Sequence, residues 1–221
     1  MKRATLVIAG NGYLADRARS AGARWIEVVP TVVDIERYRI RPTSRQDAFT
    51  IGWIGTPGTA LYLKNAQAAL HSLGKIGRAK VLLVGSGAVT TEGVVTEHRE
   101  WSEETEVADI QDFDVGIMPL LDGPWERGKC GYKLIQYMAC GKPVVASPVG
   151  VNCQIVDHGV NGFLSESASD WLNALSELMH SQELCTRMGS AGRRLVEQRY
   201  CLQVTAPRIA DLMVAALGQE V

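Results

Sequence analysis

Apolar and polar positions divide the 221-residue chain into short apolar runs that alternate with amphipathic segments. Unbroken apolar runs are typical of strands buried on both faces, and apolar positions at helical spacing predict helices. The predicted strands cover residues 5–9, 25–29, 49–54, 80–84, 94–97, 113–118, 144–146 and 163–164, and the predicted helices cover 11–21, 59–73, 103–110, 131–140, 168–179, 183–199 and 205–217. This alternation is typical of an α/β fold.

The segment 129–150, KCGYKLIQYMACGKPVVASPVG, is the most informative part of the chain. A helix over 131–140 would have an apolar side and a mostly polar side. The apolar side carries Leu134, Ile135 and Met138, and the other side carries Lys133, Gln136 and Cys140. Gly141 fits the position after the helix, where a positive φ is easily adopted, and Pro143 prevents the helix from resuming.

Two lysines stand at the start of this predicted helix. Lys129 precedes it, where backbone N–H groups point outward and the helix dipole is positive, and Lys133 lies one turn inside. This combination predicts a site for an anion, most naturally a phosphate. Two solvated lysines on an ordinary amphipathic helix would give the same pattern, and helix geometry alone leaves both interpretations open.

Two glycine-bearing loops follow predicted strands. The loop Gly55-Thr56-Pro57-Gly58-Thr59 follows the strand 49–54, and its backbone could approach an anion closely. The loop 85–87 begins like a dinucleotide-binding fingerprint, but Thr90 stands where the third glycine of that fingerprint belongs. A nicotinamide-dependent oxidoreductase is therefore disfavoured.

The phrase YMACGKPVVAS, residues 137–147, resembles the nucleotide-sugar-binding segment of GT-B glycosyltransferases of family GT4. The resemblance is strong over residues 113–164 and moderate over 24–63. It implies the C-terminal, donor-binding domain of that fold, a Rossmann-like parallel sheet with helices on both faces. The implied divisions are 1–30 as the tail of an N-terminal Rossmann-like domain whose remainder is absent, 31–48 as a linker, 49–204 as the nucleotide-sugar-binding domain and 205–221 as a helix returning to the first domain. The alternative is that residues 1–30 begin a single sheet.

The resemblance also implies a donor site. Its expected members are Gly55, Thr56, Gly58 and Thr59 on the first loop and Lys129, Cys130, Gly131, Tyr132, Lys133 and Gln136 around the helix. The family commonly carries two glutamates eight positions apart, but here those positions are Gly128 and Gln136. Glu126 is two positions from the first and could substitute for it. The commoner arginine and lysine of the first loop are also replaced, which leaves Lys129 and Lys133 as the best catalytic cations.

The resemblance implies a retaining transferase that passes a hexosyl group from a nucleoside diphosphate sugar to a sugar or lipid acceptor. Such a transferase would need no metal, since lysines and a helix terminus can stabilise the leaving diphosphate. The missing first domain would supply the acceptor site, so the chain is expected to be inactive alone. Two alternatives stay open, a nucleotide-sugar epimerase of the same fold and a degenerate, non-catalytic binding module.

The composition of the chain restricts the kinds of partner and the location that we expect. The 23 basic and 24 acidic residues give a net charge of −1, which argues against nucleic-acid binding. Apolar runs are too short to span a bilayer. Five cysteines without a CxxC pair fit reduced thiols and a cytoplasmic protein, membrane-peripheral at most in its full-length form. The last helix should expose an apolar face, through which two copies could form a dimer.

Overall fold

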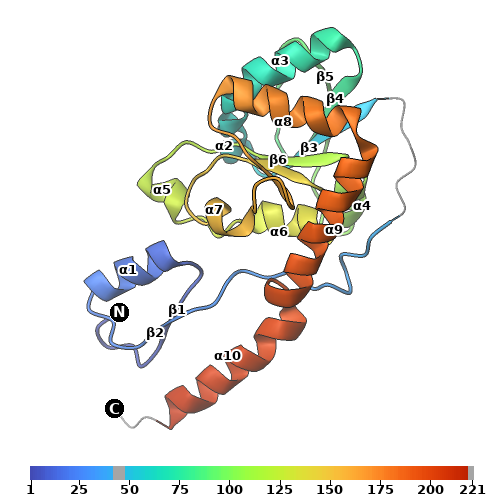
Figure 1. The fold of residues 1–221 in the computed structure, drawn as a ribbon. Coiled ribbons are helices and arrows are strands. Elements are labelled where there is room, and N and C mark those ends of the chain that lie inside the picture. The colour runs from blue at the N-terminus through green and yellow to red at the C-terminus, as the bar shows by residue number, and fades with distance from the viewer. Residues whose placement is uncertain (42–47, 219–221) are drawn as a thin grey trace.

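The computed structural model of the chain describes residues 1–41 and 48–218, which form a large α/β body and a smaller unit beside it (Figure 1). The strands of the body are β3 (Phe49–Ile54), β4 (Ala79–Val84), β5 (Val95–Arg99), β6 (Val115–Met118), β7 (Val144–Ala146) and β8 (Gly162–Leu164). Its helices are α2 (Pro57–Ala60), the 3-10 helix η1 (Leu61–Asn65), α3 (Gln67–Ile76), α4 (Glu106–Gln111), α5 (Pro124–Arg127), α6 (Tyr132–Ala139), α7 (Asn152–Ile155), α8 (Ala168–His180) and α9 (Gln182–Arg199). The smaller unit contains β1 (Val7–Ala9), α1 (Gly12–Ser20) and β2 (Ile26–Val28), and α10 (Leu202–Leu217) runs past it.

Among the described residues, the body has one parallel sheet with the strand order β5-β4-β3-β6-β7-β8. Helices α3 and α8 pack on one face of this sheet, and α4 and α6 pack on the other, as Figure 1 shows. Helix α9 contributes to both apolar cores, because its first half joins the core beside α8 and Val196 joins the core beside α6. The predicted Rossmann-like sheet with helices on both faces is confirmed.

The chain reverses the direction in which strands are added between β3 and β6. From β3 the sheet grows outward through β4 to β5, and from β6 it grows the other way through β7 to β8. In open α/β sheets ligands bind beyond the carboxyl ends of the strands at such a switch point. The site is therefore expected where β3 and β6 end, next to the N-terminus of α6.

The smaller unit has its own sheet. Strands β1 and β2 pair in parallel, and neither pairs with the body's sheet within the described part of the chain. Helix α1 crosses between them and contacts both strands. The alternative that residues 1–30 open a single sheet with the body is therefore wrong.

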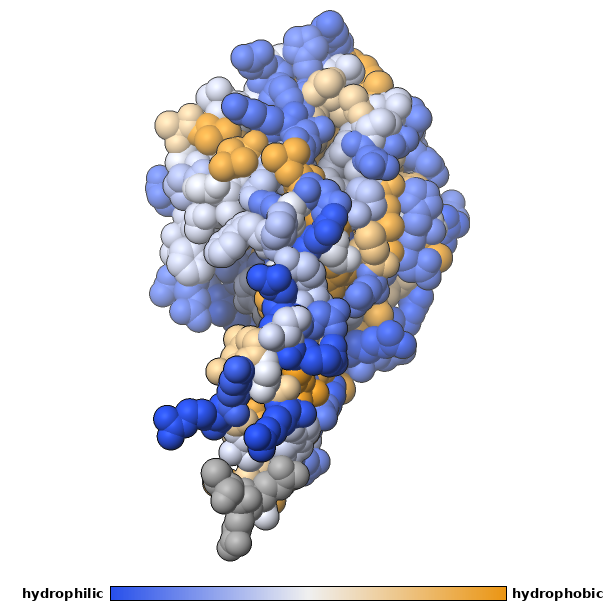
Figure 2. All heavy atoms as spheres, turned by 90° about the vertical axis from the view of Figure 1, so that its left-hand side faces the viewer, coloured by the Kyte–Doolittle hydropathy of each residue, from blue (hydrophilic) through white to orange (hydrophobic). Residues whose placement is uncertain are grey.

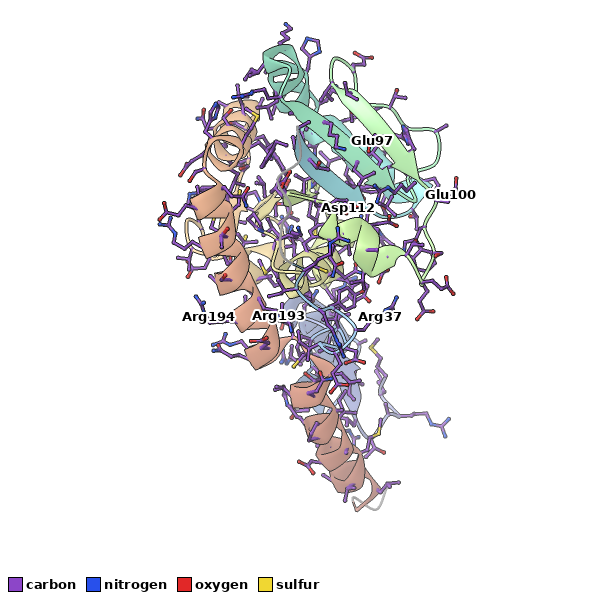
Figure 3. The ribbon with its side chains drawn as sticks, turned by 90° about the vertical axis from the view of Figure 1, so that its right-hand side faces the viewer. Arg37, Glu97, Glu100, Asp112, Arg193 and Arg194 are labelled. Carbon is purple, nitrogen blue, oxygen red and sulfur yellow. The ribbon has the colours of Figure 1, made fainter. Side chains whose placement is uncertain are left out.

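The segment after β2 is tied to the body at two points. The Val33 amide donates to the Tyr200 carbonyl at 3.1 Å, and the Leu202 amide donates to the Val33 carbonyl at 2.9 Å. Tyr38 is buried in the core beside α6. Its carbonyl and that of Ala139 both accept from Arg193 of α9, a residue labelled in Figure 3. The predicted linker 31–48 includes residues 42–47, which lie outside the described residues.

Two predicted elements differ from those observed. The segment 119–130, for which no helix or strand is predicted, contains α5, which begins with Gly123 as N-cap and Pro124 at the first helical position. The helix expected over 59–73 is divided into α2, η1 and α3. Within η1 the consecutive residues Tyr62 and Leu63 join the two different apolar cores of the body.

Helix α10 exposes apolar side chains, as expected. Val214 is 71% and Leu217 is 86% exposed, and Val204 and Met213 are exposed as well. In Figure 2 tan and orange spheres lie among blue ones on the narrow lower part of the molecule, which contains this helix and the smaller unit. No helix in the described part of the chain is long and apolar enough to cross a membrane.

Candidate functional site

Tyr137 fixes α6 against the two strands at the switch point. Its hydroxyl accepts a hydrogen bond from the Ile54 amide of β3 at 3.1 Å and lies 3.5 Å from the Ile117 carbonyl oxygen of β6, to which it donates. Gly116 leaves room for this ring, because a Cβ there would lie 2.2 Å from the Tyr137 Cδ2 atom. The first turn of α6 therefore lies at the carboxyl edge of the sheet, with its backbone N–H groups unpaired within the helix.

The ammonium of Lys133 lies between α6 and the segment of residues 55–59, whose last three residues begin α2 and which is here called the β3–α2 loop. Its Nζ is 4.2 Å from the centroid of the Trp53 ring and 3.5 Å from Thr59 Oγ1. Across residues 1–41 and 48–218, no carboxylate forms an ion pair with this lysine. Burial, and secondarily the charge of Lys129, lowers the pKa of Lys133 to about 7. An incoming anion would stabilise the charged form of this amine.

The β3–α2 loop wraps closely around this ammonium. The Thr56 amide donates to Thr59 Oγ1 at 3.2 Å, and Thr59 Oγ1 donates to the Thr56 carbonyl at 3.0 Å. A Cβ on Gly55 would lie 2.6 Å from Lys133 Nζ, whereas a Cβ on Gly58 would meet no atom within 4 Å. The structure therefore brings Gly55, Thr59 and Lys133 together and leaves the loop backbone open at Gly58.

Lys129 and Glu126 meet at Tyr62, a residue of η1. Lys129 Nζ lies 5.4 Å from the centroid of the Tyr62 ring, and the Tyr62 hydroxyl donates to Glu126 Oε1. That hydrogen bond is the largest cause of the raised pKa of Tyr62. Two of the three predicted catalytic residues are thus joined by an aromatic side chain.

Gln136 is held in the core. It is 3% exposed, and its Nε2 donates to the Tyr38 hydroxyl at 2.9 Å. Tyr38 in turn donates to the buried carboxylate of Glu106. Cys140 is buried too, and burial raises the pKa of its thiol to about 12. The predicted polar side of α6 is therefore wrong beyond Lys133, because α9 and the segment that contains Tyr38 cover it.

The three residues before Lys133 have different surroundings. Gly131 is the N-cap of α6 with φ +68°, and a Cβ there would lie 2.3 Å from Ile155 Cδ1, so the position requires glycine. Tyr132 is exposed. Cys130 is half-buried and contacts the smaller unit, where a Cβ on Gly10 would lie 2.4 Å from its Sγ. The side chain of Cys130 therefore lies against the smaller unit.

Trp101 follows β5 and lies at the carboxyl edge of the sheet. It is 51% exposed, and its Nε1 donates to Glu106 Oε2 at 2.9 Å. Gly85, at the end of β4, fits between Trp101 and the Gly55 carbonyl, because a Cβ there would lie 3.0 Å and 2.4 Å from them. The loops after β3, β4 and β5 thus meet beside the switch point.

Sequence reasoning did not single out three residues that shape the site. Trp53 carries the ring next to Lys133, and Tyr62 carries the ring next to Lys129. Asn11 donates to the Lys129 carbonyl at 2.9 Å from the smaller unit. Only Asn11 had a sequence signal, as the first residue of a predicted helix, and that signal says nothing of its distant partner.

A family model described as "Glycosyl transferases group 1" matches residues 48–181, more than half of the chain. The chain belongs to the group 1 glycosyl transferases. The comparison with curated proteins found no match.

Solved structures agree with this family in fold. Anabaena HepE in complex with UDP and glucose has a TM-score of 0.75 at 19% identity and covers 95% of this chain. A sucrose-phosphate synthase from Thermosynechococcus elongatus has a TM-score of 0.76 at 18% identity over 96% of this chain. The C-terminal domain of LpcC, a group 1 family protein from Francisella tularensis, has a TM-score of 0.60 at 15% identity over 77% of this chain. These structures confirm the GT-B type of fold.

This group 1 glycosyl transferase chain is shorter than two of those structures. It covers 63% of the HepE chain and 58% of the sucrose-phosphate synthase chain, and it covers 100% of the LpcC domain. In the described part of the chain, no group of three or more His, Cys, Asp or Glu side chains could hold a metal ion.

Proposed function

We propose that this chain is the donor-binding half of a retaining, GT4-type glycosyltransferase that transfers a hexosyl group from a nucleoside diphosphate sugar to a sugar or lipid acceptor. The observation that carries the proposal is Lys133, a half-buried cation at the switch point with the Trp53 ring and Thr59 as its neighbours. Solved structures of HepE, which has the same fold, contain UDP with glucose, UDP-glucose or UDP. A diphosphate is the anion that best fits both the lysine and the fold.

In this proposal the diphosphate lies between the β3–α2 loop and the first turn of α6. Lys133 and the backbone N–H groups of that turn bind it, and Lys129 contributes a second positive charge. Negative charge on the diphosphate grows as the bond to the sugar breaks. Fixed cations and dipoles at that place therefore stabilise the transition state more than the bound donor. No acid or base is needed for such a leaving group, and the proposal includes no metal.

The acceptor site belongs, in this proposal, to a preceding domain of which residues 1–30 are the last part. The apolar face of α10 would pack on that domain. A chain without it binds the donor and does not transfer the sugar. A cytoplasmic location stays a prediction from the cysteine pattern, and the five cysteines are unpaired in the structure.

Calorimetric titration with UDP, GDP, ADP and NADH tests the proposal. We expect one diphosphate to bind and Lys133→Ala to weaken it at least about tenfold, since a hydrogen bond to a charged group contributes about 1.5 to 3 kcal/mol. Lys64→Ala is the matched control, because Lys64 is an exposed lysine of η1. Binding of NADH alone, or equal losses in both variants, would contradict the proposal.

A second candidate is a binding module that has lost catalysis. It is favoured by the two family glutamate positions, because Gly128 has no side chain to offer and the Gln136 amide is bonded to Tyr38 in the core. Both candidates predict donor binding. Release of the nucleoside diphosphate by the full-length protein with an acceptor extract separates them, since only the transferase releases it at a rate that depends on the acceptor.

A further inference from the structure

The side chain of Asn11 joins the smaller unit to the loop that precedes α6. Asn11 is 4% exposed, and its Oδ1 accepts a hydrogen bond from the Leu14 amide at 2.9 Å as the N-cap of α1. Its Nδ2 lies 2.9 Å from the Lys129 carbonyl oxygen, 3.2 Å from that of Gly128 and 3.4 Å from that of Arg127. One amide therefore serves both parts of the molecule at once.

Both polar atoms of the Asn11 amide meet backbone groups that lack a partner within their own helix. The amides at the start of α1 and the carbonyls at the end of α5 have no partners within their own helices. An asparagine offers an acceptor to the first set and two N–H donors to the second. Aspartate could replace the acceptor but not the donors, and its charge would repel the three carbonyl oxygens.

A second contact holds the same loop. Gly10 approaches Cys130 so closely that a Cβ on it would lie 2.4 Å from Cys130 Sγ. Cys130 Sγ also lies 3.9 Å from Asn11 Nδ2. The loop of residues 127–131 thus has the smaller unit packed against it immediately before the first turn of α6.

We propose that Asn11 is a positioning residue of the donor site, which holds the Gly128–Lys129 backbone so that the Lys129 ammonium faces the diphosphate. This inference rests on the proposed function for its ligand. Asn11 does not touch the donor in this arrangement. Because it belongs to the smaller unit, a shift of that unit relative to the body changes the affinity for the donor.

Two substitutions of Asn11 test the affinity. Asn11→Ser keeps an N-cap for α1 and loses the reach to the three carbonyls, and Asn11→Asp adds repulsion. We expect about a fivefold loss of affinity for UDP, GDP or ADP, whichever the unmodified chain binds, in Asn11→Ser, and a larger loss in Asn11→Asp. Ser181→Ala is the control, because it removes the N-cap of α9, far along the chain from this loop, and should leave the affinity unchanged.

A double-mutant comparison separates positioning from general destabilisation. If Asn11 acts through Lys129, Asn11→Ser should cost little further affinity in a Lys129→Ala background. In a Lys64→Ala background it should still cost about fivefold. Equal losses in the two backgrounds would overturn the positioning role.

A measurement without nucleotide makes the inference independent of the ligand. Cys130 is half-buried beside Gly10, and Cys153 is exposed and serves as an internal reference. We expect Asn11→Ser to speed alkylation of Cys130 by iodoacetamide at least about threefold, measured by peptide mass spectrometry, and Ser181→Ala not to. If no diphosphate binds the unmodified chain but Cys130 becomes more reactive, the proposed function fails and the positioning of the loop stands. An unchanged Cys130 rate in Asn11→Ser overturns the inference.

Discussion

Lys133 Nζ lies 4.2 Å from the centroid of the Trp53 ring, which is almost fully buried at the end of β3. A cation over an aromatic face is attracted by the partial negative charge that the quadrupole of the neutral ring places on that face, so the amine stays in place without a carboxylate partner. Because a carboxylate would compete with a bound phosphate, this arrangement keeps the lysine available to an anionic ligand. Because the pKa of the Lys133 amine is about 7, its charge changes within an accessible pH range, and the effects of that charge on binding and stability can be measured.

Binding of a nucleotide sugar should depend on the protonation of Lys133. Its pKa of about 7 in the free protein rises when the diphosphate binds, because a nearby negative charge favours the ammonium. Affinity should therefore be full below about pH 7 and fall as pH rises above it, with uptake of a proton on binding. A nucleotide sugar is the right probe, because it lacks the terminal phosphate that titrates near pH 6.

Calorimetry in buffers of different ionisation enthalpy measures that proton uptake. Lys133→Arg is the control, since arginine stays charged across this range and should give a flat pH profile. A profile that falls equally in Lys133→Arg would assign the pH dependence to another group.

Removal of the Lys133 charge should stabilise the ligand-free protein. The pKa of Lys133 is lower in the folded than in the unfolded chain, so the destabilisation is full below about pH 7 and is relieved as pH rises towards about 10. We expect Lys133→Met to raise the free energy of unfolding by about 1 to 3 kcal/mol at pH 6 and by less at pH 9. Urea unfolding at the two pH values measures this, and a gain that grows with pH would contradict it.

The ring and the hydroxyl of Tyr62 should have separable effects. The ring lies under Lys129 and the hydroxyl donates to Glu126. Since a cation–aromatic contact at a partly exposed site contributes about 0.5 to 1 kcal/mol, we expect Tyr62→Leu to weaken diphosphate binding about two- to fivefold. Tyr62→Phe keeps the ring and should bind within about twofold of the unmodified chain. If Tyr62→Phe loses as much affinity for the diphosphate as Tyr62→Leu, the hydroxyl and its hydrogen bond to Glu126 hold the site, and the ring does not.

Replacing Gln136 with the glutamate that the family commonly carries should destabilise the protein. A carboxylate in Gln136→Glu would compete with Glu106 for the single Tyr38 hydroxyl hydrogen, in a place that is almost fully buried. An unpaired buried charge is costly, so we expect a loss of about 3 to 5 kcal/mol in the free energy of unfolding.

The exposed Gln182→Glu is the matched control for this substitution. It lies in the first turn of α9, where a negative charge is tolerated or slightly stabilising. A Gln136→Glu variant that unfolds like the unmodified chain and binds its diphosphate more tightly would instead assign position 136 to the donor site.

The apolar face of α10 should make the isolated 221-residue chain self-associate. Met213, Val214 and Leu217 are all more than half exposed. Exposed apolar patches of this kind are typical of interaction surfaces. We expect sedimentation velocity to show a concentration-dependent dimer, and Val214→Asp to shift it to monomer. Asp211→Asn, on the same helix, is the control, and a monomer at all concentrations would contradict the prediction.

Local sequence signals predicted most of the body. The unbroken apolar runs identified the central strands, because the residues of a strand buried on both faces are mostly apolar. Gly141 marked the end of α6 and has φ +70°, as a residue after a helix often does. Pro124 would also have marked α5, since proline favours the first position of a helix, but four residues are too few for a periodic pattern.

Patterns among neighbouring residues were enough to predict the order of strands and helices along the chain, the family and the lysines at the start of α6. Which side chains meet at the site depends instead on how distant segments pack. Nothing near position 136 indicates that Tyr38 will cover it, and nothing near position 129 indicates that Asn11 and Tyr62 will hold its backbone and its ammonium. Such contacts join segments 67 to 118 residues apart, and they exist only once the sheet and the helices have packed.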